Sequence, residues 1–517
     1  MSIKSRSSKA SRSEVGSLAE KEPYQDNYDE SLTYGGVDMA ELDQSDVIMQ
    51  RKMKLINDAL DEIGFTWYHF KYAVDSQLTL LESLTREMIN YDFGKPFAVP
   101  NVLNYAGMLS GAMFWGFSAD LIGRRLAFNL TLFLAAVFTI YCGTMGTLSS
   151  YGIMIYLIAF SFGGNLVLDT TCFMEFLPHK QNWLITFFAV FWGVGGTIAS
   201  ATALGFLPRW SCTETECPDP ANNGWRYLFY TNGSIVLFLA LARVTVVNLE
   251  ETPKFLVANK RDEEAVEVLH KIANKYNRTC SLTVEQLEAC GEIISNEDFR
   301  RSSDIKGTLR IVRKHIAHLF SNRRVARSTT TLLFSWLVLG IAYPLYTTYL
   351  PMYLKAKGAA TGSSSLHQNY VDLVISNAVS TAGPAISGIM LWLLPILGSR
   401  GVMCFGGLVS CGFLIGYAFV STHAQNVALS SVSFLAVFIY YSVLYAYSPS
   451  VLPTSARATG NACCIGITRF ASCFVPIIAF YGDPNTNVPI FVCAGLMGLL
   501  GVVSLFYPFE PSKQRIV

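Results

Sequence analysis

The feature that most constrains the fold is a series of long apolar stretches. Eleven stretches have about 20 residues each, the length that an α-helix needs to cross the hydrocarbon core of a bilayer. They lie near residues 101–118, 126–146, 151–175, 183–206, 227–248, 329–352, 371–397, 401–421, 427–448, 462–482 and 488–508. The chain is 51% hydrophobic and only 15% charged, which suits a membrane environment. The sequence therefore predicts an all-α membrane protein.

A twelfth span is expected at residues 65–88, although this stretch carries several charged side chains. An odd number of spans would reverse the second half of the chain relative to its basic loops. With twelve spans and the N-terminus in the cytosol, the cytosolic loops hold most of the Lys and Arg residues, as the positive-inside rule requires. We therefore expect both termini in the cytosol and the protein in the plasma membrane, with an internal membrane as the alternative.

The spans form two similar halves. Gly123, Arg125 and Pro178 recur with one constant offset as Gly398, Arg400 and Pro453. Such repeats predict two six-helix bundles that rock around a substrate site between them. The predicted divisions are a disordered cytosolic tail at 1–50, an N-terminal bundle at 51–248, a charged cytosolic linker with short helices at 249–328, a C-terminal bundle at 329–508 and a cytosolic tail at 509–517.

Several function classes are disfavoured by composition and motifs. The net charge of +1 gives no electrostatic footprint for nucleic acid. We find no metal-ligand spacing, no cofactor motif and no pairing of nucleophile and base, so we expect neither catalysis nor a metal or cofactor. Most cysteines lie in apolar segments. Only Cys212 and Cys217 share a polar loop, where they either form a disulfide or remain free thiols.

The stretch GFSADLIGRR, residues 116–125, joins the second and third spans with an acid, a glycine and two arginines. Gly123 permits a tight turn, and Asp120 can accept hydrogen bonds from a helix N-terminus or from guanidinium groups. Arg124 and Arg125 can reach carboxylates at the ends of other helices. A simple surface anchor would explain the arginines but not an acid within the membrane. We therefore favour a functional loop.

This loop resembles the G-x-x-x-D-[RK]-x-G-[RK]-[RK] motif of the major facilitator superfamily, with Leu121 in place of the usual base. EETPKFL (250–256) resembles the motif that follows span six in sugar porters. YSPSVLPTSARATG (447–460) resembles the motif after span ten, with Ser450 in place of the family's glutamate. GGNLVLDTTCFMEFLP (163–178) is similar to the fungal branch related to synaptic-vesicle and organic-ion transporters. The resemblance implies the fold of that superfamily and an alternating-access carrier.

Asp169 and Glu175 are acids within the fourth span. An ionised carboxylate at the bilayer centre costs about 2.5–3.5 kcal/mol, so such a group usually faces a wet cavity or a partner. Glu175 resembles a family glutamate that clusters with the loop arginines, although a helix-end glutamate in headgroup water is the alternative. The cytoplasmic gate that the resemblance implies comprises Gly116, Asp120, Gly123, Arg124, Arg125, Glu175, Glu251 and Arg457.

Asp169 lies deeper and shares a helix face with Asn165 through i, i+4 spacing. Arg469, in the eleventh span, resembles an arginine that organic-ion carriers hold near their substrate, and Asp75 is a third charge, in the first span. We expect Asp75, Asn165, Asp169 and Arg469 to line a pathway for substrate or protons. Alternatively, the charges neutralise one another as a structural cluster. The sequence leaves proton-coupled and facilitative transport both open.

The function expected from these features is transport of a small polar or anionic organic solute by a monomer in the lipid bilayer. The alternative is a non-transporting membrane sensor or scaffold of the same fold. Its support is the first span, which is shorter than in relatives by about two helical turns, or about 10 Å. A wrongly joined gene model would explain the same shortening. A membrane enzyme has the least support.

Overall fold

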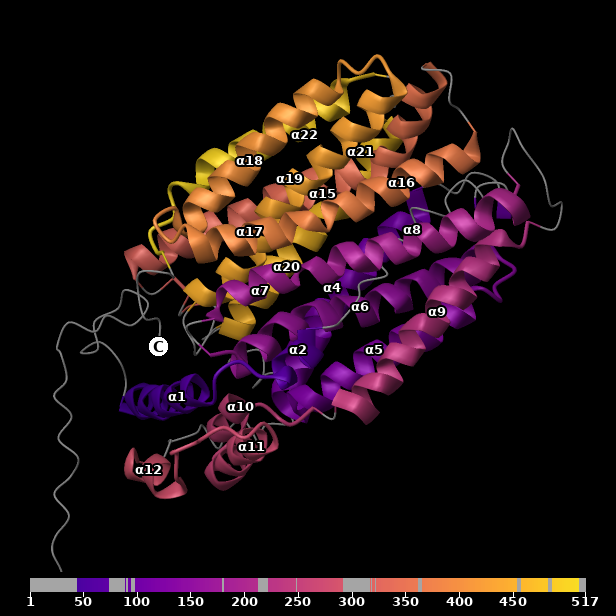
Figure 1. Cartoon of the computed structure of the whole chain (residues 1–517). Coiled ribbons are helices and arrows are strands. Elements are labelled where there is room, and N and C mark those ends of the chain that lie inside the picture. The colour runs from indigo at the N-terminus through magenta and orange to yellow at the C-terminus, as the bar shows by residue number, and fades with distance from the viewer. Residues whose placement is uncertain are drawn as a thin grey trace, which may run out of the picture.

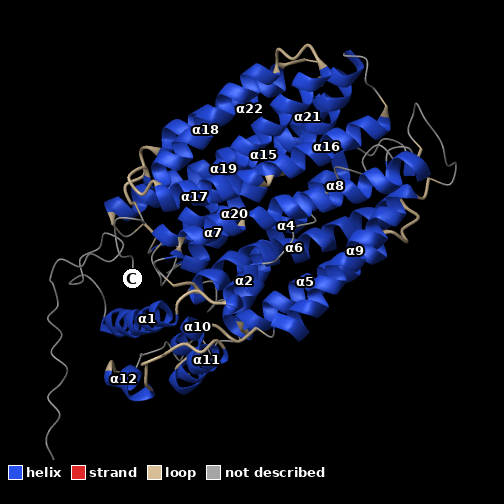
Figure 2. Ribbon diagram, viewed as in Figure 1, coloured by secondary structure: helices blue, strands red, loops and turns tan. Residues whose placement is uncertain are grey.

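The computed structural model describes most of the chain as helices. The described residues are 44–73, 89, 92–93, 98–178, 181–212, 222–247, 249–291, 317, 319–320, 322–360, 365–452, 457–481 and 486–510. Among them no residue lies in a strand (Figure 2). Asp75 and Cys217 lie outside the described residues, and so do the side chains of Asp120 and Arg457.

The two halves of the chain form two groups of long, roughly parallel helices (Figure 1). The first group contains α2 (Trp67–Ala73), α4 (Ala98–Ile122), α5 (Arg124–Cys142), α6 (Leu148–Phe176), α7 (Trp183–Phe188), α8 (Val190–Trp210), α9 (Gly224–Ala242) and the π-helix η3 (Arg243–Val247). The second group contains α15 (Arg323–Ala360), α16 (Leu366–Ser380), α17 (Ala382–Leu393), α18 (Gly398–Tyr417), α19 (His423–Val451), α20 (Arg457–Ser472), α21 (Val475–Tyr481) and α22 (Val488–Ser504).

The helices match the predicted spans. Within the described residues, nine helices are long and apolar enough to cross a membrane, and they coincide with the predicted spans three to eleven. Helix α4 covers the second span, and α22 is a shorter apolar helix at the twelfth. Large apolar side chains such as Phe238, Phe419 and Leu393 remain exposed on the outside of the bundles, as expected for surfaces that face lipid. Of the first span, α2 is described, and residues 74–88 are not.

Small residues bring helices into close contact. A Cβ atom added at Gly107 would overlap the carbonyl of Tyr156, and one added at Gly111 would overlap the carbonyl of Phe160. Helices α4 and α6 therefore approach as closely as small residues spaced four apart allow.

The two bundles meet along two seams. In one seam, α8 packs on α16, and the Asn377 amide donates to the Ser200 hydroxyl over 3.1 Å. In the other seam, α4 packs on α20, where a Cβ added at Gly116 would lie 3.7 Å from that of Ala462. Gly116 thus contacts the C-terminal bundle. Both of these contacts use polar or small residues, whereas Trp183 of α7 stacks on Trp392 of α17 over 5.9 Å elsewhere between the bundles.

Four further helices lie at one end of the molecule (Figure 1). They are α1 (Gln44–Ile63), α10 (Pro253–Ala258), α11 (Asp262–Lys275) and α12 (Val284–Ala289), and we call this end the linker end. Leu269 and Ile272 of α11 are buried, and they share one apolar core with Ile56 and Leu60 of α1. Because α1 begins at Gln44, residues 44–50 are helical and do not belong to a disordered tail.

Polar contacts also hold α1 on the linker. The Lys52 ammonium pairs with the Asp262 carboxylate, and their side chains are only 4% and 15% exposed. At the other end of α1, the Ser281 hydroxyl and backbone N–H donate to Glu62 over 2.7 and 2.9 Å, and these bonds hold the pKa of Glu62 below its usual value. The Glu62 contact therefore stabilises the docked helix near neutral pH and is lost as the pH falls through that lowered pKa.

We predict that Asp262→Asn loosens α1, because it leaves the buried Lys52 charge without its partner, a loss of the order of 3–5 kcal/mol for buried pairs. Trypsin should then cut α1 after Arg51 or Lys54 faster than in the wild type, as followed by mass spectrometry. The matched control is Asp58→Asn, on an exposed position of α1. Equal cleavage rates in the two variants would show that the ion pair does not hold the helix.

Candidate functional site

A carboxylate holds the turn between α4 and α5. Glu251 accepts hydrogen bonds from the backbone N–H groups of Arg124 (3.0 Å) and Arg125 (3.3 Å), which begin α5. Gly123 makes the turn with φ of +96°, a conformation that only glycine adopts easily. A Cβ at this position would also lie 2.7 Å from Glu251 Oε2. The negative charge lies at the positive end of the helix dipole, where it is stabilising.

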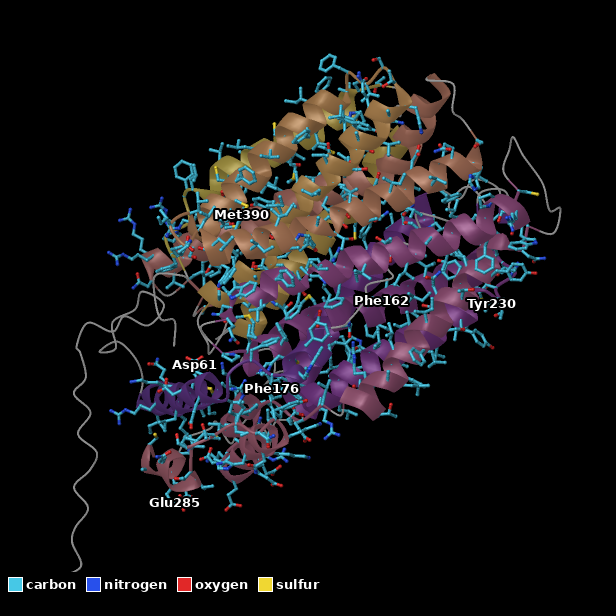
Figure 3. All side chains as sticks on the ribbon, viewed as in Figure 1. Asp61, Phe162, Phe176, Tyr230, Glu285 and Met390 are labelled. Carbon is cyan, nitrogen blue, oxygen red and sulfur yellow. The ribbon has the colours of Figure 1, made fainter. Side chains whose placement is uncertain are left out.

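Two more predicted gate contacts meet at this turn. The Arg124 guanidinium forms an ion pair with Glu175 near the end of α6, and it lies 5.8 Å from the centre of the Phe255 ring of α10. The structure thus brings Arg124, Glu175 and Glu251 together from three parts of the N-terminal half. In Figure 3 the neighbouring Phe176 lies toward the linker end. The gating role of this group stays a prediction.

The C-terminal half repeats the arrangement with a residue that sequence reasoning missed. Glu510 accepts hydrogen bonds from the backbone N–H groups of Ser399 (2.8 Å) and Arg400 (3.3 Å), at the start of α18. Gly398 makes the turn with φ of +59°. The signal was the repeat itself: because Gly123 recurs as Gly398, an acid after the last helix should have been sought as the counterpart of Glu251.

Five aromatic side chains fill the space between the bundles, and we call them the aromatic cluster: Trp192, Trp336, Tyr343, Tyr441 and Tyr445. The ring of Trp192, from α8, lies 4.6 Å from that of Tyr445 and 5.3 Å from that of Tyr441, both on α19. Tyr343 of α15 stacks on Tyr441 at 5.2 Å. The cluster therefore joins one helix of the N-terminal bundle to two helices of the C-terminal bundle.

Two of the predicted pathway charges border the aromatic cluster. Arg469 of α20 is 9% exposed and interacts with the hydroxyl of Tyr441. Asp169 of α6 is half-buried. Both charges act electrostatically on Tyr445, whose hydroxyl donates to the carbonyl of Leu166 on α6. The structure thus places Asp169 of the N-terminal bundle and Arg469 of the C-terminal bundle near Tyr445, whose hydroxyl links the two bundles.

Asn165 belongs to a different group of contacts. Its Oδ1 accepts from the guanidinium of Arg243 (3.3 Å) and from the hydroxyl of Thr131 (3.4 Å). Arg243 is buried, donates to the carbonyl of Phe128 over 3.0 Å and lies 3.8 Å from the centre of its ring. These contacts all lie within the N-terminal bundle. Sequence reasoning missed Arg243, although an arginine at the end of the sixth span was a visible signal.

Cys212 is bonded in a disulfide. Its backbone N–H donates to the side chain of Asn222 over 2.9 Å, and the Asn222 amide donates to Asp92 over 2.6 Å. Because Cys217 lies outside the described residues, the pairing of Cys212 with Cys217 stays a prediction.

Comparison with known proteins identifies the family. The model of the Major Facilitator Superfamily matches residues 88–480. The chain belongs to the Major Facilitator Superfamily. It is 34% identical to an uncharacterised MFS-type transporter of Schizosaccharomyces pombe, over 90% of this chain and 89% of that one. It is 33% identical to the MFS siderochrome iron transporter 1 of Ceriporiopsis subvermispora, over 92% and 94% of the two chains.

The fold agrees with solved superfamily structures. The proton:xylose symporter XylE, bound to 6-bromo-6-deoxy-D-glucose, superposes with a TM-score of 0.62 at 16% sequence identity, covering 89% of this chain and 97% of that one. The protein is therefore an integral, multi-pass membrane protein with the superfamily fold, as the sequence predicted. Its membership and its relatives make it a transporter of a small solute.

We predict that Gly123→Ala destabilises the turn, because the backbone at φ +96° and ψ +146° costs a non-glycine residue about 1–3 kcal/mol and because the added Cβ meets Glu251. The measurement is thermal unfolding of the purified protein in nanodiscs, where the variant should melt at a lower temperature. Gly205→Ala is the control, since a Cβ there meets no atom within 4 Å; it should melt at the wild-type temperature or above. A wild-type melting temperature for Gly123→Ala would contradict the prediction.

Proposed function

We propose that this superfamily member carries a polar or anionic organic solute through a site between its bundles, bordered by Asp169, Arg469 and the aromatic cluster. The observation that carries the proposal is the position of Arg469, a charge in the membrane-spanning region beside the interface of the two bundles. A buried guanidinium needs an anionic or polar partner. An anionic group on the solute could supply that partner during transport.

The aromatic cluster supports a closed centre in this conformation. Tyr445 reaches from α19 to the Leu166 carbonyl on α6, and Trp192 packs on Tyr445 from α8. A solute that enters between the bundles must separate these contacts. Alternating access would therefore consist of breaking them on one side while the other side stays closed.

The charged group at the linker end supports a gate on that side. Arg124, Glu175 and Glu251 link α5, α6 and the start of the linker, so these elements would move together. Glu510 does the same for α18 and the C-terminal end of the second bundle. We place the linker end in the cytosol because of the distribution of Lys and Arg. We propose that the protein lies in the plasma membrane and that the monomer is the transporting unit.

We further propose that Asp169 takes up a proton during the cycle, which would make the protein a proton-coupled carrier. The relatives do not agree on a solute: one is named for siderochrome iron, another is an organic cation/carnitine transporter of Arabidopsis thaliana, and the fold match is a proton:xylose symporter. The solute therefore has to be found by experiment. Comparing metabolites in cells with and without the protein would supply it.

We predict that Arg469→Ala lowers uptake of that solute into vesicles at least about tenfold, because a hydrogen bond to a charged group contributes about 1.5–3 kcal/mol. The amount of protein in the membrane should stay unchanged. The matched control is Phe470→Ala, the next residue of α20, whose side chain is 53% exposed on the outside. Wild-type uptake by Arg469→Ala would remove Arg469 from the site.

We predict that Asp169→Asn abolishes accumulation driven by a proton gradient while leaving exchange of solute across the membrane, because an amide cannot release a proton. The measurement compares uptake with and without an imposed pH difference in proteoliposomes. Arg469→Ala serves as the contrast, since it should reduce both modes. Gradient-driven accumulation by Asp169→Asn would show that another group carries the proton.

A further inference from the structure

The C-terminal bundle contains a second ionisable group of side chains, away from Asp169 and Arg469. Asp372 lies on α16 inside the bundle and is 2% exposed, and His423 is the first residue of α19. His423 Nε2 lies 3.6 Å from Asp372 Oδ1. The Gln368 amide lies between them, 3.0 Å from Asp372 Oδ1 and 3.5 Å from His423 Nε2. The proposed transport mechanism uses none of these residues.

Parallel packing of two helices creates this group. Gln368 contacts His423, Ser376 contacts Ser431, and further along the same helices Ser387 contacts Ser442. The register between α16–α17 and α19 is therefore constant, and it sets Asp372 level with Val427, the residue after Asn426. Figure 3 shows Met390 of α17 on the side of the linker end, so the chain runs toward that end along α16 and α17. Asp372 comes early in α16 and therefore lies near the opposite end of the bundle.

Two buried amides on the same two helices each leave one polar atom without a hydrogen bond within the described residues. Asn426 Nδ2 and Asn369 Oδ1 make no hydrogen bond within the described part of the chain, although the two residues are 0% and 7% exposed. Asn426 Oδ1 accepts from the Tyr417 hydroxyl over 2.9 Å. Unpaired buried polar atoms cost about 1–3 kcal/mol each, which points to hydrogen bonds that form in another state of the group. We call Gln368, Asn369, Asp372, His423 and Asn426 the α16–α19 cluster.

We propose that the α16–α19 cluster is a proton-binding site, in which Asp372 and His423 hold one proton that enters from the end opposite to the linker. The proposal goes beyond the proposed function, because it concerns a second site in a different bundle. His423 is the entry point, since its side chain is 32% exposed.

The hydrogen bonds show how the proton would be held. The Gln368 amide has two N–H groups, which can serve Asp372 Oδ1 and an unprotonated His423 Nε2 at once. A proton on His423 Nε2 turns that acceptor into a donor, so the Gln368 N–H must leave it. The Nε2–H then faces Asp372, and the two opposite charges attract. The freed Gln368 amide can turn toward the unpaired amides of the cluster.

Asp372 and the start of α19 act on a charge at His423 in opposite directions. Among the described residues, the groups that act electrostatically on Asp372 are His423 from α19 and Tyr417 from α18. The buried carboxylate favours a proton on His423, whereas the N-terminus of α19 disfavours a positive charge at its first residue. At the seam, α8 presents the neutral Ser200 to α16.

The test is a pH titration of the full-length protein in nanodiscs with isotope-labelled histidines, followed by NMR from about pH 5 to 8. His423→Gln assigns the signal among the seven histidines. In the wild type the His423 signal should titrate within this range. Asp372→Asn should make His423 harder to protonate, because the neighbouring negative charge is gone. Half-protonation should then need a proton concentration about tenfold higher than in the wild type. A signal that does not titrate overturns the proposal.

Two further variants make the outcome decisive. Gln368→Met removes the donor that serves the unprotonated ring, so His423 should become easier to protonate, opposite to Asp372→Asn. If Asp372→Asn fails to fold, this opposite shift alone tests the site. His367→Gln is the matched control, because His367 is exposed on the same helix and its loss should leave the His423 titration unchanged. A His423 titration that Asp372→Asn and Gln368→Met leave unchanged would overturn the proposal. The titration needs no transported solute. Its result therefore tests the proton site separately from the proposed transport function.

Discussion

The cost of keeping charge among apolar helices decides where this protein places its ionisable side chains. Each buried charge described here has a polar neighbour: Arg243 has the Asn165 amide, Arg469 has the Tyr441 hydroxyl, and Asp372 has the Gln368 amide. Removing the polar neighbour leaves the buried charge without a partner. An unpaired charge is strongly destabilising where water cannot solvate it. The charges therefore fix which helices must stay neighbours, and the apolar surface fills the remaining space.

In each half of the chain, one carboxylate caps the start of a helix. Glu251 and Glu510 each follow the last long helix of a half and receive the first N–H groups of α5 and α18. In both turns a glycine with positive φ leaves room for the carboxylate. A capped helix start and a helix end from the same half thus become one unit. Rigid halves of this kind are what motion between two bundles requires, because the movement is then confined to the seams.

The fold could be predicted from the sequence because length and apolarity are local properties. Spans three to eleven coincide with apolar helices, and the repeated glycines Gly123 and Gly398 lie at the two turns. Contacts between distant residues could not be predicted in this way. Helix α1 contacts α11, which lies about 200 residues later in the chain. The mixed polar and apolar composition of α1 gave no indication of this contact. Glu510 follows no motif recognised in the sequence, and Asp372 meets His423 only through the register of α16 and α19.

The two ionisable sites differ in their relation to the movement of the bundles. Asp169 lies on α6, and its neighbour Tyr445 lies on α19, so the surroundings of Asp169 change whenever the bundles separate. Asp372 and His423 both belong to the C-terminal bundle, so their distance is preserved when that bundle moves as a rigid body. A proton on Asp169 can therefore be linked to the transport cycle through changing contacts. A proton on the α16–α19 cluster reports instead on the pH at one face, because its partners remain together throughout the cycle.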